Sequence, residues 1–148
     1  MTRATSPLPF DESVGFLVRD LNRAIQRALQ AKLAASGVAP GAWYFLRVLW
    51  EEEGLTQRAL AGRVGMMEPT AVIALRGLER AGWIVRTRNP TDRRKIHVSL
   101  TPAGRALRER LLPLAHAVNA EVCRGLSAEE QAGLFVLLRR ARGNLESG

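Results

Sequence analysis

Apolar residues recur every three or four positions along most of this chain, the spacing of one face of an α-helix. Stripes of this kind predict helices over residues 11–35, from Pro40 to Gly54, from Ala103 to about Arg124, and from Ser127 onward. Between residues 83 and 101 the spacing changes to an alternation of apolar and polar side chains, which predicts β-strands. The pattern therefore predicts a mainly helical protein with a small sheet in its second half.

Two helices joined by a tight turn are predicted between residues 55 and 82. Thr56 is a suitable N-cap for a helix over residues 57–64, and Gly65 supplies the turn. Pro69 suits the first turn of the next helix, which Gly82 ends. This arrangement is a helix–turn–helix.

A β-hairpin is predicted to follow the second of these helices. Its strands cover residues 83–88 and 96–100, and the segment Asn89–Asp92 interrupts the pattern with a turn. The basic run Arg93–Lys95 begins at the hairpin tip, so the hairpin has the position and charge of a wing.

We therefore expect one compact chain of the mainly α class, with a winged helix–turn–helix at residues 55–102 flanked by helical dimerisation regions at 11–54 and 103–148. A length of 148 residues suits one domain with helical extensions. The outer helices carry more apolar surface than a winged module of ~50 residues can cover, so part of it should be buried in a dimer.

The net charge of the chain is concentrated in the winged module. Residues 55–105 hold ten Lys or Arg against three Asp or Glu, which accounts for +7 of the formal +8. A basic surplus confined to a helix–turn–helix and its hairpin indicates binding to nucleic acid. The sequence shows no nucleophile–base constellation, no paired-carboxylate arrangement and no phosphate-cradling glycine loop, so we do not expect an enzyme.

Other features of the composition limit the location and the cofactors. No apolar run approaches the ~20 residues of a membrane span, and residues 1–10 lack the charged-then-apolar layout of a secretory signal, so we expect a cytoplasmic protein. The lone Cys123 fits a reducing compartment and excludes an internal disulfide framework. Two histidines in different elements form no recognisable metal site, and no cofactor is expected.

Two segments resemble the MarR-type (multiple antibiotic resistance regulator) winged-helix family. Residues 82–104, from Gly-Trp-Ile-Val-Arg through Asn-Pro-Thr-Asp-Arg-Arg-Lys to Leu-Thr-Pro-Ala-Gly, look like the family's wing with its Asp-Arg-Arg tip and its Leu-Thr-x-x-Gly exit into the next helix. Residues 55–61, Leu-Thr-Gln-Arg-Ala-Leu-Ala, resemble the first helix of its helix–turn–helix. The order of helices extends the resemblance from about Asp11 to Leu145.

The resemblance implies a homodimer built from the N- and C-terminal helices. In that family the dimer binds a short palindromic operator in double-stranded DNA, with one recognition helix per half-site in the major groove and one wing in each flanking minor groove. Many members release DNA when a small aromatic or phenolic acid binds between the dimerisation helices and the winged module. We therefore expect a transcriptional repressor of palindromic promoter sites that such an effector releases.

The DNA-binding residues are expected on the wing and on the recognition helix. Arg94 is the candidate for the minor groove, whose negative potential attracts a guanidinium, and Asp92 can hold it by a charge-assisted hydrogen bond. The resemblance assigns these two residues the same roles. Phosphate contacts are expected from Arg86, Arg88, Arg93 and Lys95 and from the helix starts at Thr56, Gln57, Arg58 and Thr70. Base contacts are expected from Glu68, Thr70, Ala71, Ile73 and Arg76, of which Ala71 and Ile73 suit thymine methyl groups.

An effector pocket is expected from the same resemblance. Aromatic walls with one or two cationic or hydrogen-bonding groups are what an aromatic carboxylate requires. The candidates are Arg19, Asn22, Trp43, Tyr44, Trp50, Met66, His97 and His116, with Phe45 and Met67 beside them. The alternative is that the aromatic residues pack in the core or in an interface, because core residues show the same helical spacing.

Two other functions remain open on the sequence alone. A thiol-based redox regulator would use Cys123 as its sensor, although redox members of the family usually carry theirs near the N-terminus. An architectural DNA-binding protein without an effector would bind promoter and random DNA equally at every salt concentration.

Overall fold

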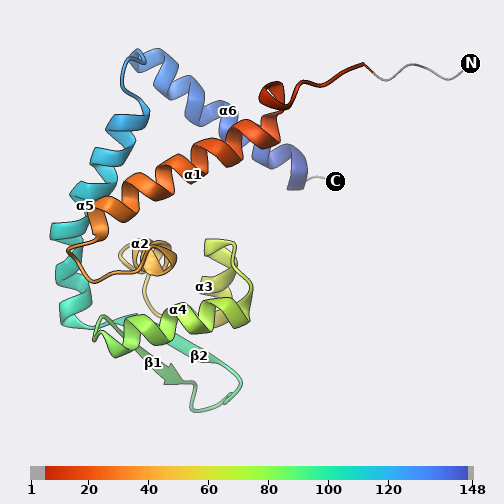
Figure 1. Cartoon of the computed structure of the whole chain (residues 1–148). Helices are drawn as coiled ribbons and strands as arrows, with labels where there is room; N and C mark the ends of the chain where they lie inside the picture. Colours follow the sequence, from red (N-terminus) through yellow and green to blue (C-terminus); the bar gives the residue numbers. More distant parts are fainter. Residues whose placement is uncertain (1–5, 147–148) are drawn as a thin grey trace, which may run out of the picture.

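In residues 6–146, which the computed structural model describes, the chain is a helical molecule with a β-hairpin at one end (Figure 1). Residues 1–5 of the N-terminal segment and residues 147–148 of the predicted C-terminal region lie outside the described residues. The elements are, in order, η1 Phe10–Glu12, α1 Val14–Leu33, η2 Pro40–Ala42, α2 Trp43–Leu49, α3 Gln57–Val64, α4 Glu68–Arg80, β1 Ile84–Arg88, β2 Ile96–Leu100, α5 Pro102–Val122 and α6 Ala128–Glu146, where η marks a 3-10 helix. None of the described helices is long and apolar enough to cross a membrane.

Side-chain caps begin both of the C-terminal helices. Thr101 Oγ1 accepts a hydrogen bond from the Gly104 N–H, 3.0 Å away, at the start of α5. At the start of α6, the side chains of Ser127 and Glu130 each accept a hydrogen bond from the other's backbone N–H, the reciprocal pattern of a capping box. Pro113 lies inside α5, which continues through it.

The helix α1 is buried at one end and exposed at the other. Leu29 and Leu33 near its C-terminal end are buried, and α1 packs along α5. The apolar side chains of its first turns are exposed, as are those in the middle of α6: Val14, Leu17, Val18, Leu21, Phe135, Val136, Leu137 and Leu138. The exposed parts of α1 and α6 lie at the end of the molecule away from the hairpin (Figure 1).

The helix α2 ends earlier than the helical spacing predicts. The apolar pattern continues toward Gly54, yet the regular helix stops at Leu49. The segment after it pairs instead with β2, because the Gly54 N–H donates to the Val98 carbonyl and the Val98 N–H donates to the Leu55 carbonyl. A backbone group that bonds to a neighbouring strand is not available to a helix, so pairing with β2 ends α2.

The helix–turn–helix and the hairpin follow the prediction. Thr56 Oγ1 accepts a hydrogen bond from the Ala59 N–H at 3.1 Å. Gly65 ends α3 with a φ of 75°, a left-handed conformation that glycine adopts at little cost. The strands β1 and β2 are antiparallel, with Ile84 opposite Leu100 at the base of the hairpin.

The hydrophobic core lies between the outer helices and the winged module. Buried side chains from α1 to α5 and from both strands form one cluster, which includes Leu29, Leu33, Phe45, Leu46, Leu49, Leu60, Leu75, Leu78, Ile84, Val98, Leu100, Leu107 and Leu111. Because interiors are close-packed, this shared core fixes the orientation of α4 and of the hairpin relative to the outer helices.

Candidate nucleic-acid interface

The helix α4 has one side in the core and the opposite side exposed. Ala71, Leu75 and Leu78 are buried on one side. With about 3.6 residues per turn, Ile73 and Arg76 fall on the other side, and both are exposed. This exposed side is the part of α4 that a DNA groove can reach.

The residues of α4 that were predicted to contact bases differ in how exposed their side chains are. Ala71 has 0% of its surface exposed, so its predicted contact with a thymine methyl group is wrong: a base would have to displace core side chains. Ile73, 71% exposed, has the position that such a contact requires. Glu68, Thr70 and Arg76 are also exposed.

Asn89 organises the tip of the hairpin. Its side-chain oxygen accepts hydrogen bonds from the backbone N–H groups of Thr91 at 2.9 Å and Asp92 at 3.1 Å, and from the Thr91 hydroxyl. The Asn89 N–H donates to the Lys95 carbonyl at 2.8 Å. Asparagine is favoured in such turns because its side chain satisfies nearby backbone donors. The tip is therefore a fixed turn that carries the basic run.

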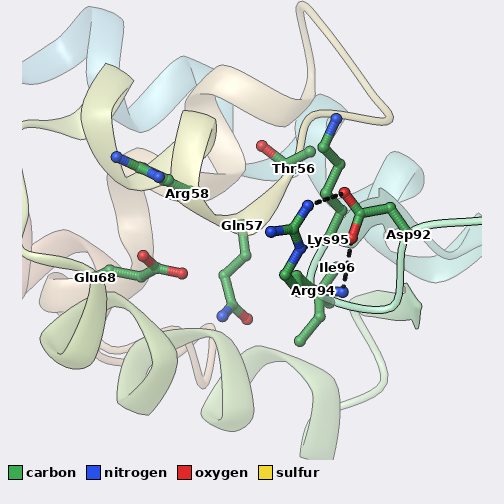
Figure 2. A pocket seen from close by; sticks show the side chains of 8 residues that line it. All are labelled: Thr56, Gln57, Arg58, Glu68, Asp92, Arg94, Lys95 and Ile96. Atoms are coloured by element: carbon green, nitrogen blue, oxygen red, sulfur yellow. Dashed lines mark hydrogen bonds and ion pairs between the residues drawn. The ribbon is translucent and has the colours of Figure 1, made fainter. Parts of the chain in front are cut away.

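Asp92 holds the Arg94 side chain at this tip (Figure 2). Arg94 Nε and Nη2 donate to the two carboxylate oxygens at 3.0 and 3.2 Å, and the Arg94 backbone N–H donates to Oδ1 at 3.2 Å. These hydrogen bonds from Arg94 lower the pKa of Asp92 below its ordinary value of 3.8. The Arg94 side chain is still 90% exposed. The predicted hydrogen bond is confirmed, and it orients an exposed guanidinium.

A concave surface lies between the wing tip and the starts of α3 and α4. Its volume is about 410 Å³. It is lined by Thr56, Gln57, Arg58, Glu68, Asp92, Arg94, Lys95 and Ile96. Figure 2 shows Arg58 and Glu68 on one side and the wing residues on the other, with Gln57 between them. All of these except Ile96 belong to the set predicted from the sequence, so the fold brings three separate predicted segments together.

Arg86 connects the wing to α4 and does not face outward. Its guanidinium donates two hydrogen bonds to the Glu79 carboxylate at 3.1 and 3.2 Å and one to Gln57 Oε1 at 3.2 Å. The Arg86 side chain is only 18% exposed, and Gln57 is buried. The Arg86 hydrogen bonds lower the pKa of Glu79 below its ordinary value of 4.5. The predicted phosphate contacts of these two side chains are therefore corrected: the Arg86 guanidinium and Gln57 Oε1 bond within the protein, and the bonds of Arg86 fix the wing against α4.

Six exposed basic residues of the winged module have no acidic partner among the described residues. Of the ten Lys and Arg residues at positions 55–105, Arg63, Arg86, Arg94 and Arg105 form ion pairs with carboxylates. The other six have no ion pair within residues 6–146 and are all exposed: Arg58, Arg76, Arg80, Arg88, Arg93 and Lys95. Arg88 also donates to the Arg93 carbonyl at 3.0 Å, which braces the hairpin. These six side chains are available to phosphates.

Two carboxylates in the segment between α2 and α3 form ion pairs, and the carboxylate of Glu53 braces the base of the wing. Glu53 accepts hydrogen bonds from the Arg105 guanidinium at 3.0 and 3.1 Å and from the Leu100 N–H at 2.9 Å. The Arg105 bonds lower the pKa of Glu53 below its ordinary value of 4.5. Glu52 pairs with Arg63 at 2.7 Å. Glu53 and Arg105 are 52 positions apart, so no local pattern identifies them as partners.

The residues predicted for an effector pocket are dispersed. Arg19 and Asn22 are exposed on α1, and His116 is exposed on α5. Tyr44 is exposed on α2, where its hydroxyl accepts a hydrogen bond from Gln26 at 3.2 Å. Phe45 is fully buried in the core and Met67 is exposed before α4, whereas Met66 lines an apolar cavity beside α4.

Trp43, Trp50 and His97 have structural partners. Trp43 is buried and contacts Trp50 edge to face, with ring centroids 5.6 Å apart. Trp50 Nε1 donates to the Gly104 carbonyl at 3.0 Å. His97 Nδ1 lies 3.0 Å from the Gly54 carbonyl and donates to it, since a carbonyl only accepts. Packing, the alternative left open for the aromatic residues, therefore describes Trp43 and Trp50, and His97 braces the segment before α3.

Cys123, the sensor in the redox alternative, is buried at the C-terminal end of α5. A buried thiol meets an oxidant poorly, because reaction requires an accessible thiolate.

Comparison with known proteins gives a consistent result. Residues 40–96 match the model of the MarR family. The HTH-type transcriptional regulator TtmR of Methylorubrum extorquens is 30% identical over 99% of this chain and 74% of its own length. The structure of Bordetella bronchiseptica BpsR, whose DNA binding is regulated by 6-hydroxynicotinic acid, is 26% identical with a TM-score of 0.84, and the match covers 93% of this chain and 98% of BpsR. A mutant of E. coli MarR complexed with operator DNA is 26% identical with a TM-score of 0.79, covering 86% and 92% of the two chains.

These matches include the outer helices as well as the winged module, because each covers most of this chain. The segment matched by the family model contains α2, α3, α4 and the Asp92–Arg94 wing tip. These comparisons, together with the geometry of the wing and of α4, establish that the chain belongs to the MarR family and is a DNA-binding transcriptional regulator, not an enzyme.

Proposed function

We propose that this regulator is a homodimer that binds a palindromic promoter site and represses transcription until a small aromatic effector binds. The observation that carries the proposal is the Arg94 guanidinium, which is 90% exposed and held by Asp92 at the hairpin tip. The same concave surface includes the start of α4. A wing and a recognition helix on one surface suit the minor and major grooves of one half-site.

Exposed apolar side chains support the homodimer. The first turns of α1 and the middle of α6 expose four large apolar residues each, including Leu17 and Phe135. Monomeric soluble proteins rarely expose large apolar patches. A second copy of the chain suits these side chains, because a twofold dimer buries the same surface on both partners. This surface lies away from the hairpin (Figure 1), so a dimer formed through it leaves both wings open to DNA.

The two kinds of DNA contact are divided between different residues. The six exposed basic residues without acidic partners supply the phosphate contacts, which set affinity and salt dependence. The exposed side of α4 supplies the sequence preference through Glu68, Thr70, Ile73 and Arg76.

The effector part of the proposal rests on a relative. Regulation of DNA binding in BpsR by 6-hydroxynicotinic acid supports a small aromatic molecule, with an aromatic acid as the expected class. The cationic groups predicted to bind such an acid in this chain lie on α1, on β2 and on α5. Whether an aromatic acid binds to this chain therefore depends on the residues that line its cavity.

Fluorescence anisotropy with labelled DNA tests the DNA-binding part. DNA from upstream of the gene is compared with a scrambled duplex of equal length at two salt concentrations. We expect preferential binding of the upstream DNA, and we expect Arg94→Ala to weaken that binding by about ten-fold or more. Arg124→Ala is the matched control, because it removes the same charge from an exposed position after α5. Equal, steeply salt-dependent binding of both duplexes would contradict the proposal and favour an architectural protein.

Analytical ultracentrifugation tests the homodimer. Leu17→Glu places a charge on the exposed part of α1 without touching the core, so it should convert a dimer to a folded monomer. Val85→Glu makes the same kind of change at an exposed apolar position on β1 and should leave the dimer intact. A Leu17→Glu protein that sediments as a dimer would show that this part of α1 is not the interface.

A further inference from the structure

An apolar cavity of about 460 Å³ lies between α4 and the loop that carries η2. We call it the α4 cavity, and its walls include Val38, Met66, Ile73, Leu78 and Trp83. Its volume is in the range of sites that bind small organic molecules, roughly 300–1,000 Å³. No residue that lines it has an ionisable side chain. A carboxylate held against these walls would therefore have no counter-charge here, which disfavours an anionic ligand.

Gly77 supports a binding role for the α4 cavity. It lies in the interior of α4, where glycine is a poor choice because it favours the helical backbone less than any residue except proline. Packing does not require it, since a Cβ built at Gly77 meets no atom within 4 Å. Gly77 lines the α4 cavity, so the missing side chain keeps one wall of the cavity open.

The polar groups of the α4 cavity are few. Thr70 contributes a hydroxyl, whereas the Nε1 of Trp83, another wall residue, is buried and has no hydrogen-bond partner within the described part of the chain. An apolar wall with a small number of hydrogen-bonding groups is typical of sites for neutral ligands with one or two polar atoms. It differs from the cation-containing pocket that an aromatic acid requires.

We propose that the α4 cavity binds a neutral aromatic molecule, such as a phenol, and that binding lowers the affinity for DNA. The effect on DNA rests on the proposed function, because Thr70 and Ile73 line the cavity and are also expected to contact bases. A ligand against these side chains changes the surface that α4 presents to the major groove. DNA in turn opposes the ligand, since coupling between two binding sites is reciprocal.

Isothermal titration calorimetry without DNA tests the cavity directly. The probes are naphthol, which is neutral, and naphthoate, which carries a carboxylate on the same ring system. We expect naphthol to bind the wild-type protein at least about ten-fold more tightly than naphthoate. Gly77→Leu should abolish naphthol binding by filling the cavity, whereas Gly62→Leu, an equally open glycine in the exposed part of α3, should not. Thermal unfolding of both variants without ligand verifies that they fold.

Each outcome decides part of the proposal. Absence of naphthol binding up to its solubility limit, equal binding of naphthoate, or full binding by Gly77→Leu would overturn the site. The effect on DNA is then measured by adding naphthol to the wild-type complex with upstream DNA, where an increase in Kd is expected. Naphthol binding without any change in the Kd for DNA would overturn the coupling. Failure of the wild-type protein to bind DNA would instead contradict the proposed function, and the calorimetry would still test the cavity.

Discussion

Replacing Gly104 by alanine should destabilise the protein, although alanine is the better helix former. A Cβ at this position would lie 2.0 Å from the Trp83 carbonyl oxygen, whereas ordinary contact begins at 3.4 Å. The first turn of α5 and the start of β1 would therefore have to separate by about 1.4 Å. The Trp83 carbonyl cannot turn away without loss, because it accepts the Thr101 N–H at 3.0 Å.

The size of the effect follows from three contributions. Overpacking costs about 1–3 kcal/mol, and the upper end applies here because the clash is with backbone. Separation also weakens the hydrogen bonds from the Thr101 N–H to Trp83 and from Trp50 Nε1 to Gly104, about 1 kcal/mol each. Alanine returns about 1 kcal/mol through its helix propensity. The free energy of unfolding should fall by about 3–4 kcal/mol.

Urea denaturation at one fixed protein concentration measures this change, since the midpoint of an associating protein depends on its concentration. Gly62→Ala is the matched control, because Gly62 lies in the interior of α3 and a Cβ there meets nothing within 4 Å. It should raise the free energy of unfolding by up to about 1 kcal/mol. A Gly104→Ala protein as stable as the wild type would refute the argument from close approach. Equal losses in both variants would show that glycine matters for another reason.

Three further predictions concern the wing and its attachment. Arg86→Ala should lower the free energy of unfolding by about 1–2 kcal/mol by removing the bonds to Glu79. Since Arg86 lowers the Glu79 pKa, the part of this difference that comes from Glu79 should be full above the ordinary value of 4.5 and should be lost as the pH falls through the lower folded pKa, whereas the part from the Gln57 bond persists. A difference that does not shrink in acid would contradict this. Thr101→Val should lower the free energy of unfolding by about 1 kcal/mol in urea denaturation by removing the α5 cap, and an unchanged free energy would contradict a stabilising cap. Asp92→Asn should weaken binding to upstream DNA about three- to ten-fold in anisotropy through loss of Arg94 orientation, and tighter binding would show that net charge dominates.

Much of the winged module could be predicted because its signals are local. Thr56 bonds a group three residues away, Gly65 needs only its own backbone freedom, and Asn89 bonds residues two and three positions ahead. The Asp92–Arg94 contact spans two positions and was predicted for the same reason. Interactions of this range depend on residue order alone, so a sequence pattern can identify them.

The orientation of α4 could not be predicted in the same way. Ala71 and Ile73 are both apolar and two positions apart, so they lie on different sides of the helix. Only the packing of α4 on the core decides that Ala71 is buried and that Ile73 faces outward. The effector candidates had the same ambiguity, because a buried Trp43 and a ligand-contacting tryptophan have the same helical spacing.

By itself, the sequence determined the order of the helices, their caps, the position of the wing and the concentration of basic charge. The tertiary structure decided which of those charges have acidic partners, since Arg86 bonds to Glu79 and Arg105 bonds to Glu53. It also brings Gly104 so close to the Trp83 carbonyl that no side chain fits there, and it forms the cavity beside α4. The physical reason is range: caps and turns join neighbours in the chain, whereas burial, ion pairs and cavities depend on segments that meet only after folding.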